Sequence, residues 1–286
     1  MKIRRDIWLI VLVGFLHFGL YAQTPVNNNS LTETLDKASM FLTDVEGDQK
    51  VKANQNLSEL IESLEVIRKK ETDDDAFLRK LFLKTNRKTL RRYSLYADFS
   101  ETMLDHNYGC LSGTILYSLL LSHFDFNFEA IELSDHIYLL VENENSKFIF
   151  ESTLGSRGFI ANKTDIDKAL SGYNERSVVN QSMTAVASLN SNEQTSVINN
   201  RIGLKELAGL QYYNKAIESF KNTELITALK QSEQSHELYP SVRIKQLMQL
   251  LVNEILYSEG LTREVKQNAL KNYISHIREN KISRTK

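Results

Sequence analysis

The chain has 286 residues and a nearly balanced charge, with 35 Lys and Arg against 36 Asp and Glu. Phosphate binding relies on clustered cations, and no basic block stands out after the N-terminal segment, so we expect no nucleic-acid partner. Only two prolines and eleven glycines occur, which favours helix-rich structure.

The first 22 residues have the order of a secretory signal peptide. Lys2, Arg4 and Arg5 precede an apolar run of about 14 residues, and Ala22 follows before the chain becomes polar. We predict cleavage after Ala22 and an exported protein, periplasmic or secreted, of bacterial type. The alternative is an uncleaved membrane anchor, because Leu20 is larger than the residue usual three positions before the cut.

Residues 31–95 show helical periodicity. Apolar residues recur at the spacing of one buried helix face: Leu57, Leu60, Ile61, Leu64 and Ile67. In the acidic run from Glu71 to Phe77, Asp side chains can cap a helix start. The basic run from Arg87 to Tyr93 would spread its cations around a helix, so we interpret it as a solvated face.

Cys110 is the single cysteine of the chain and cannot form a disulfide within it, although exported proteins meet an oxidising environment. Gly109 interrupts regular structure before it. Apolar residues after it have the spacing of a helix that buries one side: Leu111, Ile115, Leu116, Leu119 and Leu120. Cys110 is therefore predicted near a helix N-terminus, where the helix dipole favours the nucleophilic thiolate. The alternative is a buried apolar cysteine.

Three strands are predicted after this helix, at about 127–133, 136–142 and 147–153, with a polar turn between the last two. A two-residue loop at Asn143 and Glu144 would place His136 opposite Glu151. A four-residue loop would pair His136 with Thr153 and leave Glu151 one diagonal step away. Either loop brings the imidazole and the carboxylate together, whereas an odd loop would place them on opposite faces.

These residues resemble the transglutaminase-like superfamily. The sequence YGC, ending at Cys110, opens an apolar helix; HIYLLV begins a strand at His136; and FEST ends the next strand. The pattern of the superfamily is G-x-C at a helix start, H-a/v-w/y in one strand and D/E-x-T in the next. The resemblance extends from Tyr108 to Gly155.

The resemblance implies a papain-like core with a catalytic triad. Cys110 would be the nucleophile, His136 the general base and acid, and Glu151 the orienting carboxylate. The spacings, 26 residues from Cys110 to His136 and 15 on to Glu151, resemble compact bacterial members more than the animal cross-linking enzymes. Glu replaces the commoner Asp, and Ser152 stands where Pro is usual.

The remainder of the chain is polar and then helical. Residues 171–200 are rich in Ser, Asn, Thr and Gln, and we interpret them as a connecting region with a candidate short helix at about 178–189. Within the tetratricopeptide-like helical region 201–286, the stretch 207–240 resembles one tetratricopeptide unit, with Ala216 at a close-packing position and Pro240 closing the second helix, and a second helix pair is predicted at about 242–257 and 262–279. A generic helical bundle is the alternative. One such unit cannot bury its apolar face alone, so we expect it to pack on its neighbour or on the core.

We therefore predict an α+β fold in which the helix bearing Cys110 packs on a small antiparallel sheet. A signal peptide (1–22) would precede helices plus the transglutaminase-like core (23–170), the connecting region (171–200) and the helical region (201–286). The expected function is a cysteine peptidase, amidase or acyltransferase acting on a peptide or protein amide, with neither cofactor nor metal. The alternative is a non-catalytic interaction module that binds a protein partner through its core and C-terminal helices.

Overall fold

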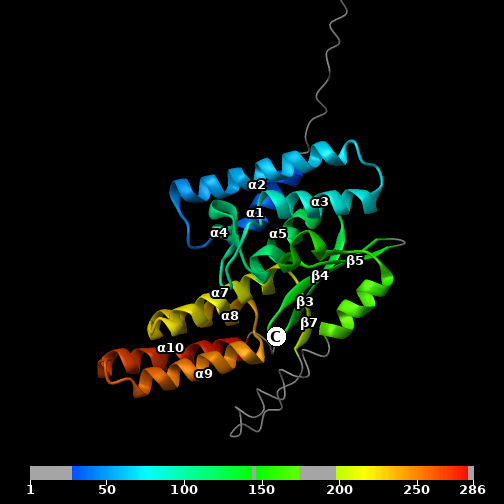
Figure 1. The fold of residues 1–286 in the computed structure, drawn as a ribbon. Helices are drawn as coiled ribbons and strands as arrows, with labels where there is room; N and C mark the ends of the chain where they lie inside the picture. The colour runs from blue at the N-terminus through cyan, green and yellow to red at the C-terminus, as the bar shows by residue number, and fades with distance from the viewer. Residues whose placement is uncertain (1–27, 144–145, 174–197, 283–286) are drawn as a thin grey trace, which may run out of the picture.

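The computed structural model describes residues 28–143, 146–173 and 198–282 (Figure 1). It has a mixed α+β architecture, with N-terminal helices, a five-stranded antiparallel sheet and packed C-terminal helices. The predicted signal peptide and the candidate helix at 178–189 lie outside the described residues.

The N-terminal helices form one side of the main core. They are α1 (Asn28–Ser39), α2 (Gly47–Arg68), α3 (Asp74–Lys88) and the short α4 (Phe99–Asp105). The predicted acidic cap is confirmed, because the side chain of Asp73 accepts a hydrogen bond of 2.7 Å from the backbone N–H of Ala76 at the start of α3.

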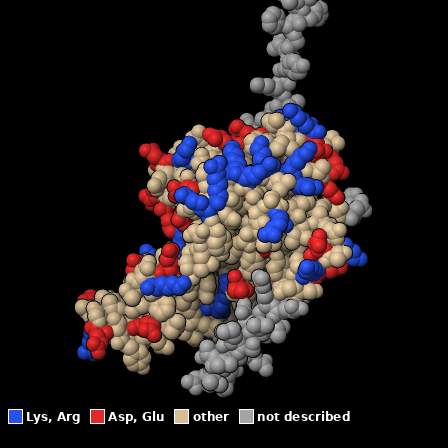
Figure 2. Space-filling model, viewed as in Figure 1, with Lys and Arg blue, Asp and Glu red and all other residues tan. Residues whose placement is uncertain are grey.

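The cations of the basic run from Arg87 to Tyr93 are exposed, as predicted, but the run is not one continuous helix. Helix α3 ends at Lys88, and Arg92–Tyr93 forms strand β1, which pairs in parallel with β2 (Asn107–Tyr108). Figure 2 shows Lys and Arg side chains gathered over α2 and α3 on one face of the molecule. The basic run therefore begins on the last turn of α3 and ends on the extended strand β1.

Helix α5 (Cys110–His123) is the central helix of the fold. The prediction that it buries only one side is wrong, since its small polar residues Ser112, Thr114 and Ser118 are buried as fully as its leucines. The reason is its position, with the N-terminal helices on one side and strands β3 and β4 on the other (Figure 1).

The sheet has the strand order β6-β5-β4-β3-β7, and neighbouring strands are antiparallel. Its strands are β3 (Asn127–Leu133), β4 (Ile137–Glu142), β5 (Lys147–Phe150), β6 (Phe159–Ile160) and β7 (Asn199–Ile202). Glu142 pairs with Lys147, so the β4–β5 hairpin has the four-residue loop, the second of the two even registers.

The predicted third strand is too long. Strand β5 ends at Phe150, and the 3-10 helix η1 (Ser152–Gly158) follows. The local cause is Glu151, whose side chain accepts a hydrogen bond from the backbone N–H of Thr153 and so caps η1.

The two faces of the sheet have different partners. Leu139 and Phe150 belong to the main core with α5, whereas Tyr138 and Ile149 pack on a smaller cluster with Ile166 and Tyr173. Residues 163–173 form a helix that covers this second face. The sheet is therefore buried on both sides beside the candidate site.

The C-terminal helices are α7 (Leu204–Lys221), α8 (Leu225–Leu238), α9 (Val242–Tyr257) and α10 (Arg263–Ile282). Helix α7 joins two cores, because its Leu207 lies in the main core and its Ala216 lies in a second core with α8, α9 and α10. Residues 199–200 of the predicted connecting region belong to the sheet, so the chain returns to the sheet before these helices begin.

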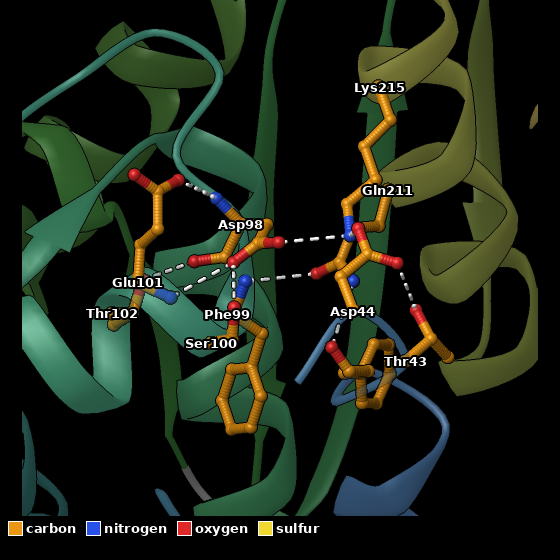
Figure 3. A network of polar contacts seen from close by, with 10 residues as sticks. Thr43, Asp44, Asp98, Phe99, Ser100, Glu101, Thr102, Gln211 and Lys215 are labelled. Atoms are coloured by element: carbon orange, nitrogen blue, oxygen red, sulfur yellow. Dashed lines mark hydrogen bonds and ion pairs between the residues drawn. The ribbon is translucent and has the colours of Figure 1, made fainter. Parts of the chain in front are cut away.

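Polar contacts also join α7 to the N-terminal half (Figure 3). Lys215 forms ion pairs with Asp98, at 2.9 Å, and with Asp44. Gln211 accepts a hydrogen bond from the backbone N–H of Phe99 and donates one to the carbonyl of Phe41. Both residues of α7 are buried, so these contacts fix the C-terminal helices to the core.

Candidate active site

Cys110 is the first residue of α5, as the sequence predicted, and its side chain is half-buried. Gly109 precedes it because the segment after β1 passes close by: a Cβ at Gly109 would lie 3.0 Å from the carbonyl oxygens of both Ser94 and Leu95. The backbone N–H of Gly109 donates to the Ser112 hydroxyl at 3.0 Å. These contacts fix the start of the helix that carries the thiol.

His136 and Glu151 form the closest polar contact of the site. Nε2 of His136 lies 2.5 Å from Oε2 of Glu151. His136 immediately precedes β4, and its carbonyl accepts a hydrogen bond of 2.8 Å from the backbone N–H of Leu133. Glu151 immediately follows β5. The four-residue hairpin loop thus brings the two side chains together across the ends of neighbouring strands.

The Glu151 carboxylate is almost completely buried, with 2% of the residue exposed. Its Oε1 accepts hydrogen bonds from the backbone N–H and the hydroxyl of Thr153, at 3.0 and 2.6 Å. Its Oε2 also accepts one from the Tyr173 hydroxyl, at 2.9 Å. Burial alone would raise the pKa of Glu151, but the hydrogen bond and charge of His136, together with the Thr153 donors, lower the pKa below its usual value.

The environment of His136 favours its charged form. Burial alone would lower the pKa of His136, but hydrogen bonding to Cys110 and Glu151 and the charges of both groups outweigh it and raise the pKa to about 10. The imidazole of His136 is therefore in its positively charged form, with a proton on each ring nitrogen, at neutral pH.

Helix η1 connects the carboxylate to the helix that carries the thiol. The Ser152 hydroxyl donates to the carbonyl of Cys110 at 3.3 Å. Gly113 allows this approach, because a Cβ there would lie 2.6 Å from Cβ of Ser152. Gly158 packs against the backbone of Glu151: a Cβ added to Gly158 would lie 1.9 Å from the carbonyl oxygen of Glu151. The first two contacts set the distance between η1 and α5, and the third packs the end of η1 on the backbone of Glu151.

A cavity of about 940 Å³ opens beside these residues. His136 and Glu151 line it, with Tyr93 from β1, Thr153 and Leu154 from η1, and Tyr173 from the helix of residues 163–173. Cys110 adjoins His136 but is not among the lining side chains.

Three residues of the site were missed by sequence reasoning. Tyr173 fell in the region interpreted as a connector, yet it stacks on Tyr138 at 4.4 Å between ring centroids and binds Glu151. Tyr93 was assigned to a solvated helix face and is 55% exposed, but it lies on β1 and lines the cavity, where partial burial and the charges of Cys110, Tyr108 and Glu151 raise its pKa. Thr153 stood in the D/E-x-T pattern, which was the one signal available for its role.

Within the described parts of the chain, no group of three or more His, Cys, Asp or Glu side chains has an arrangement that could hold a metal ion. Among the same residues, no helix combines the length and the apolar composition that crossing a membrane requires. Comparison with protein-family models, with curated proteins and with solved structures gives no match for this chain.

Proposed function

We propose that this protein is an exported, transglutaminase-like cysteine enzyme that cleaves or transfers an acyl group at an amide bond. Cys110 is the nucleophile, His136 the general base and acid, and Glu151 the orienting carboxylate. The observation that carries the proposal is the 2.5 Å contact between Nε2 of His136 and the buried Glu151 carboxylate, with Cys110 at the start of α5 contributing to the raised pKa of His136.

The hydrogen bonds of the site assign the proton positions. Because Nε2 of His136 donates to Glu151, Nδ1 is the ring nitrogen that remains for proton exchange with the thiol. Transfer of the thiol proton to Nδ1 gives a thiolate and an imidazolium, and Glu151 stabilises the imidazolium. Thr153 and Tyr173 hold the carboxylate in the orientation that this pairing requires.

Acylation then follows from the thiolate. Sγ of Cys110 attacks the amide carbonyl carbon, a C–S bond forms, and the carbonyl electron pair moves to the oxygen. The backbone N–H of Cys110, at the positive end of α5, is a candidate donor to this oxyanion. The intermediate collapses as the C–N bond breaks, and the imidazolium gives its proton to the departing amine.

Deacylation uses the same histidine. The neutral imidazole takes a proton from water, or from an acceptor amine, as that nucleophile attacks the thioester carbonyl. The C–S bond breaks and the thiolate returns. Water gives a peptidase or amidase, which we favour because exported proteins work in excess water, and an amine gives an acyl transferase.

The fold supports the same assignment. The chain order of Cys, His and carboxylate, with the thiol on a buried helix and the other two groups at the ends of adjacent antiparallel strands, is what the papain-like core of the transglutaminase-like superfamily requires. We also propose that α7 and α8 form a tetratricopeptide-like pair. Ala216 and Ala228, one on each helix, are fully buried in the second core, which supports this.

Alkylation of Cys110 across pH tests the proposal most directly. We expect iodoacetamide to modify Cys110 in the folded protein at pH 6, well below the value of about 8.5 at which a free thiol ionises. His136→Ala should remove most of that reactivity, since the imidazolium stabilises the thiolate. A thiol that stays inert until the protein unfolds, and that does not respond to His136→Ala, would favour the non-catalytic interaction module instead.

A further inference from the structure

The cavity beside His136 carries more positive than negative charge on its accessible walls. Arg79 of α3, Arg157 of η1 and Lys168 of the helix at 163–173 line it, and all three are exposed. Asp165 is the single exposed carboxylate among the lining residues. Glu151 does not offset these cations, because its charge is matched by His136.

These three cations have no anion of their own. Within the described residues, none of them lies within 4.0 Å of a carboxylate, and none donates a side-chain hydrogen bond. Asp165 lies three residues before Lys168 on the same helix, yet the two do not pair. By contrast, Lys80 of α3 is paired with Glu71. The cavity thus keeps free cations that other parts of the surface neutralise.

The origin of the cations indicates convergence. They come from α3 and from two later, consecutive elements, η1 and the helix at 163–173, and each element also contributes to the cavity lining. Helix η1 holds Arg157 six residues after Glu151, and the helix at 163–173 holds Lys168 five residues before Tyr173. On α3, the carboxylate of Asp75, four residues before Arg79, accepts hydrogen bonds from the side chains of Asn143 and Ser146. Such a concave, predominantly positive surface raises the local concentration of anions.

Carboxylates match these groups well. A guanidinium presents paired N–H donors in the geometry of a carboxylate, and an ammonium adds a point charge. We propose that the cavity binds the acyl side of an acidic peptide, with a carboxylate-bearing side chain held by Arg79, Arg157 and Lys168 while the scissile amide lies at Cys110. This inference names the substrate class of the site and rests on the proposed function.

Binding without turnover tests it. The full chain with Cys110→Ala would be titrated into fluorescein-labelled hexaglutamate and, separately, hexaglutamine, at 0.15 M salt, and followed by fluorescence anisotropy. We expect hexaglutamate to bind at least about tenfold more tightly than hexaglutamine, as three charge-assisted contacts warrant. Equal affinities, or no measurable binding of hexaglutamate, would overturn the inference.

A matched pair of triple variants locates the effect. Arg79→Gln, Arg157→Gln and Lys168→Gln together should reduce hexaglutamate affinity about tenfold or more and leave hexaglutamine unchanged. Lys230→Gln, Lys245→Gln and Lys271→Gln change the net charge equally, on exposed positions of α8, α9 and α10, and should change affinity less than twofold. Equal losses in both triple variants would mean that net charge alone attracts the peptide, which contradicts a site in the cavity.

The peptide-binding experiment and the alkylation experiment can fail independently of each other. If Cys110 proves inert but the cavity variants alone lose hexaglutamate, the amide chemistry fails and the anion site stands. If Cys110 is reactive at pH 6 but hexaglutamate does not bind, the enzyme stands and the acidic substrate class is wrong.

Discussion

Nε2 of His136 lies 2.5 Å from Oε2 of Glu151, and the same carboxylate receives three further hydrogen bonds from Thr153 and Tyr173. A carboxylate with four donors has little freedom to rotate. It therefore fixes the plane of the imidazole as well as its charge. The thiol depends on this arrangement through the histidine, which makes Glu151 a positioning residue in the proposed mechanism.

Glu151→Gln tests that role. The amide can still accept from Thr153 but presents its own N–H group toward His136 in place of an acceptor, so the imidazole loses its orientation and the stabilisation of its charge. We expect turnover of a responsive amide substrate to fall by about 10³-fold, while alkylation of Cys110 falls much less. The pKa of His136, followed by NMR titration, should drop from about 10.

Glu142→Gln is the matched control for this substitution. Glu142 ends β4 in the same hairpin, but its side chain is about half exposed and pairs with Lys147. It should leave turnover and the His136 titration unchanged. An unaltered His136 pKa in Glu151→Gln would contradict the positioning role.

The raised pKa of His136 also predicts how stability depends on pH. The imidazole gains its partners on folding, so its contribution is present in full below the unfolded value of about 6.5. It declines as pH rises and is lost as pH passes through about 10. In urea titrations, the difference in unfolding free energy between the wild type and His136→Ala should shrink steadily from pH 6.5 to pH 10. A constant difference over that range would contradict the raised pKa.

The sequence allowed the start of the site to be predicted, because its signals there are local. Gly109 and the apolar spacing after it placed Cys110 at a helix N-terminus, and the strand at 127–133 was predicted at its observed bounds. An even hairpin loop would place His136 and Glu151 on one face in either of two registers, whereas the odd loop that the sequence left open would not. Choosing between them required the true turn, which polar residues alone do not determine.

Other features could not be predicted because they depend on contacts distant in the chain. Helix α5 is an exception: it is buried all round because helices and sheet enclose it, and its sequence, apolar on every side with only small polar residues between, carried that signal. Tyr173 contacts Glu151 through its hydroxyl group, and no sequence motif distinguishes a tyrosine at the end of a polar helix. Tyr93 lies on a two-residue strand that forms only through pairing with β2.

Gly158→Ala should disturb the carboxylate without changing any polar side chain. A Cβ at this position would lie 1.9 Å from the carbonyl oxygen of Glu151, so the backbone must move and the hydrogen bond from the Glu151 N–H to the Gly158 carbonyl must lengthen. We expect a loss of about 1–3 kcal/mol in unfolding free energy. We also expect weaker alkylation of Cys110 at pH 6, because η1 moves away from α5.

Gly260→Ala provides the control for this backbone effect. It lies in the turn between α9 and α10, and a Cβ there would meet no atom within 4 Å. Its unfolding free energy and its alkylation rate should stay at wild-type values. If Gly158→Ala behaves like Gly260→Ala, the close packing of η1 on the Glu151 backbone is not needed to position the carboxylate.

The ion pair between Lys215 and Asp98 predicts that the C-terminal helices and the core unfold together. The two side chains are 10% and 11% exposed, and their nitrogen and oxygen atoms are 2.9 Å apart (Figure 3). Asp98 also caps α4, because it accepts hydrogen bonds from the backbone N–H of Glu101 and the hydroxyl of Ser100. Helix α4 leads through β2 to Cys110, so α7 is connected through one carboxylate to the segment that enters the site.

Lys215→Met removes the cation and leaves Asp98 buried without it. Burial raises the pKa of Asp98, and Lys215 with the other donors lowers it below the usual value; the variant should therefore raise that pKa and destabilise the protein by about 3 kcal/mol near neutral pH. Adding Asp98→Asn should recover most of this loss, since Asn retains the cap without the charge. Lys245→Met, an exposed change on the next pair of helices, should have little effect.

Urea denaturation, followed by far-ultraviolet and near-ultraviolet circular dichroism, measures these differences in stability. A single transition in the wild type, and a separate early transition of the C-terminal helices in Lys215→Met, are the expected result, because the buried ion pair joins α7 to the N-terminal half. An unchanged single transition in Lys215→Met would show that the apolar packing of α7 holds the cores together without it.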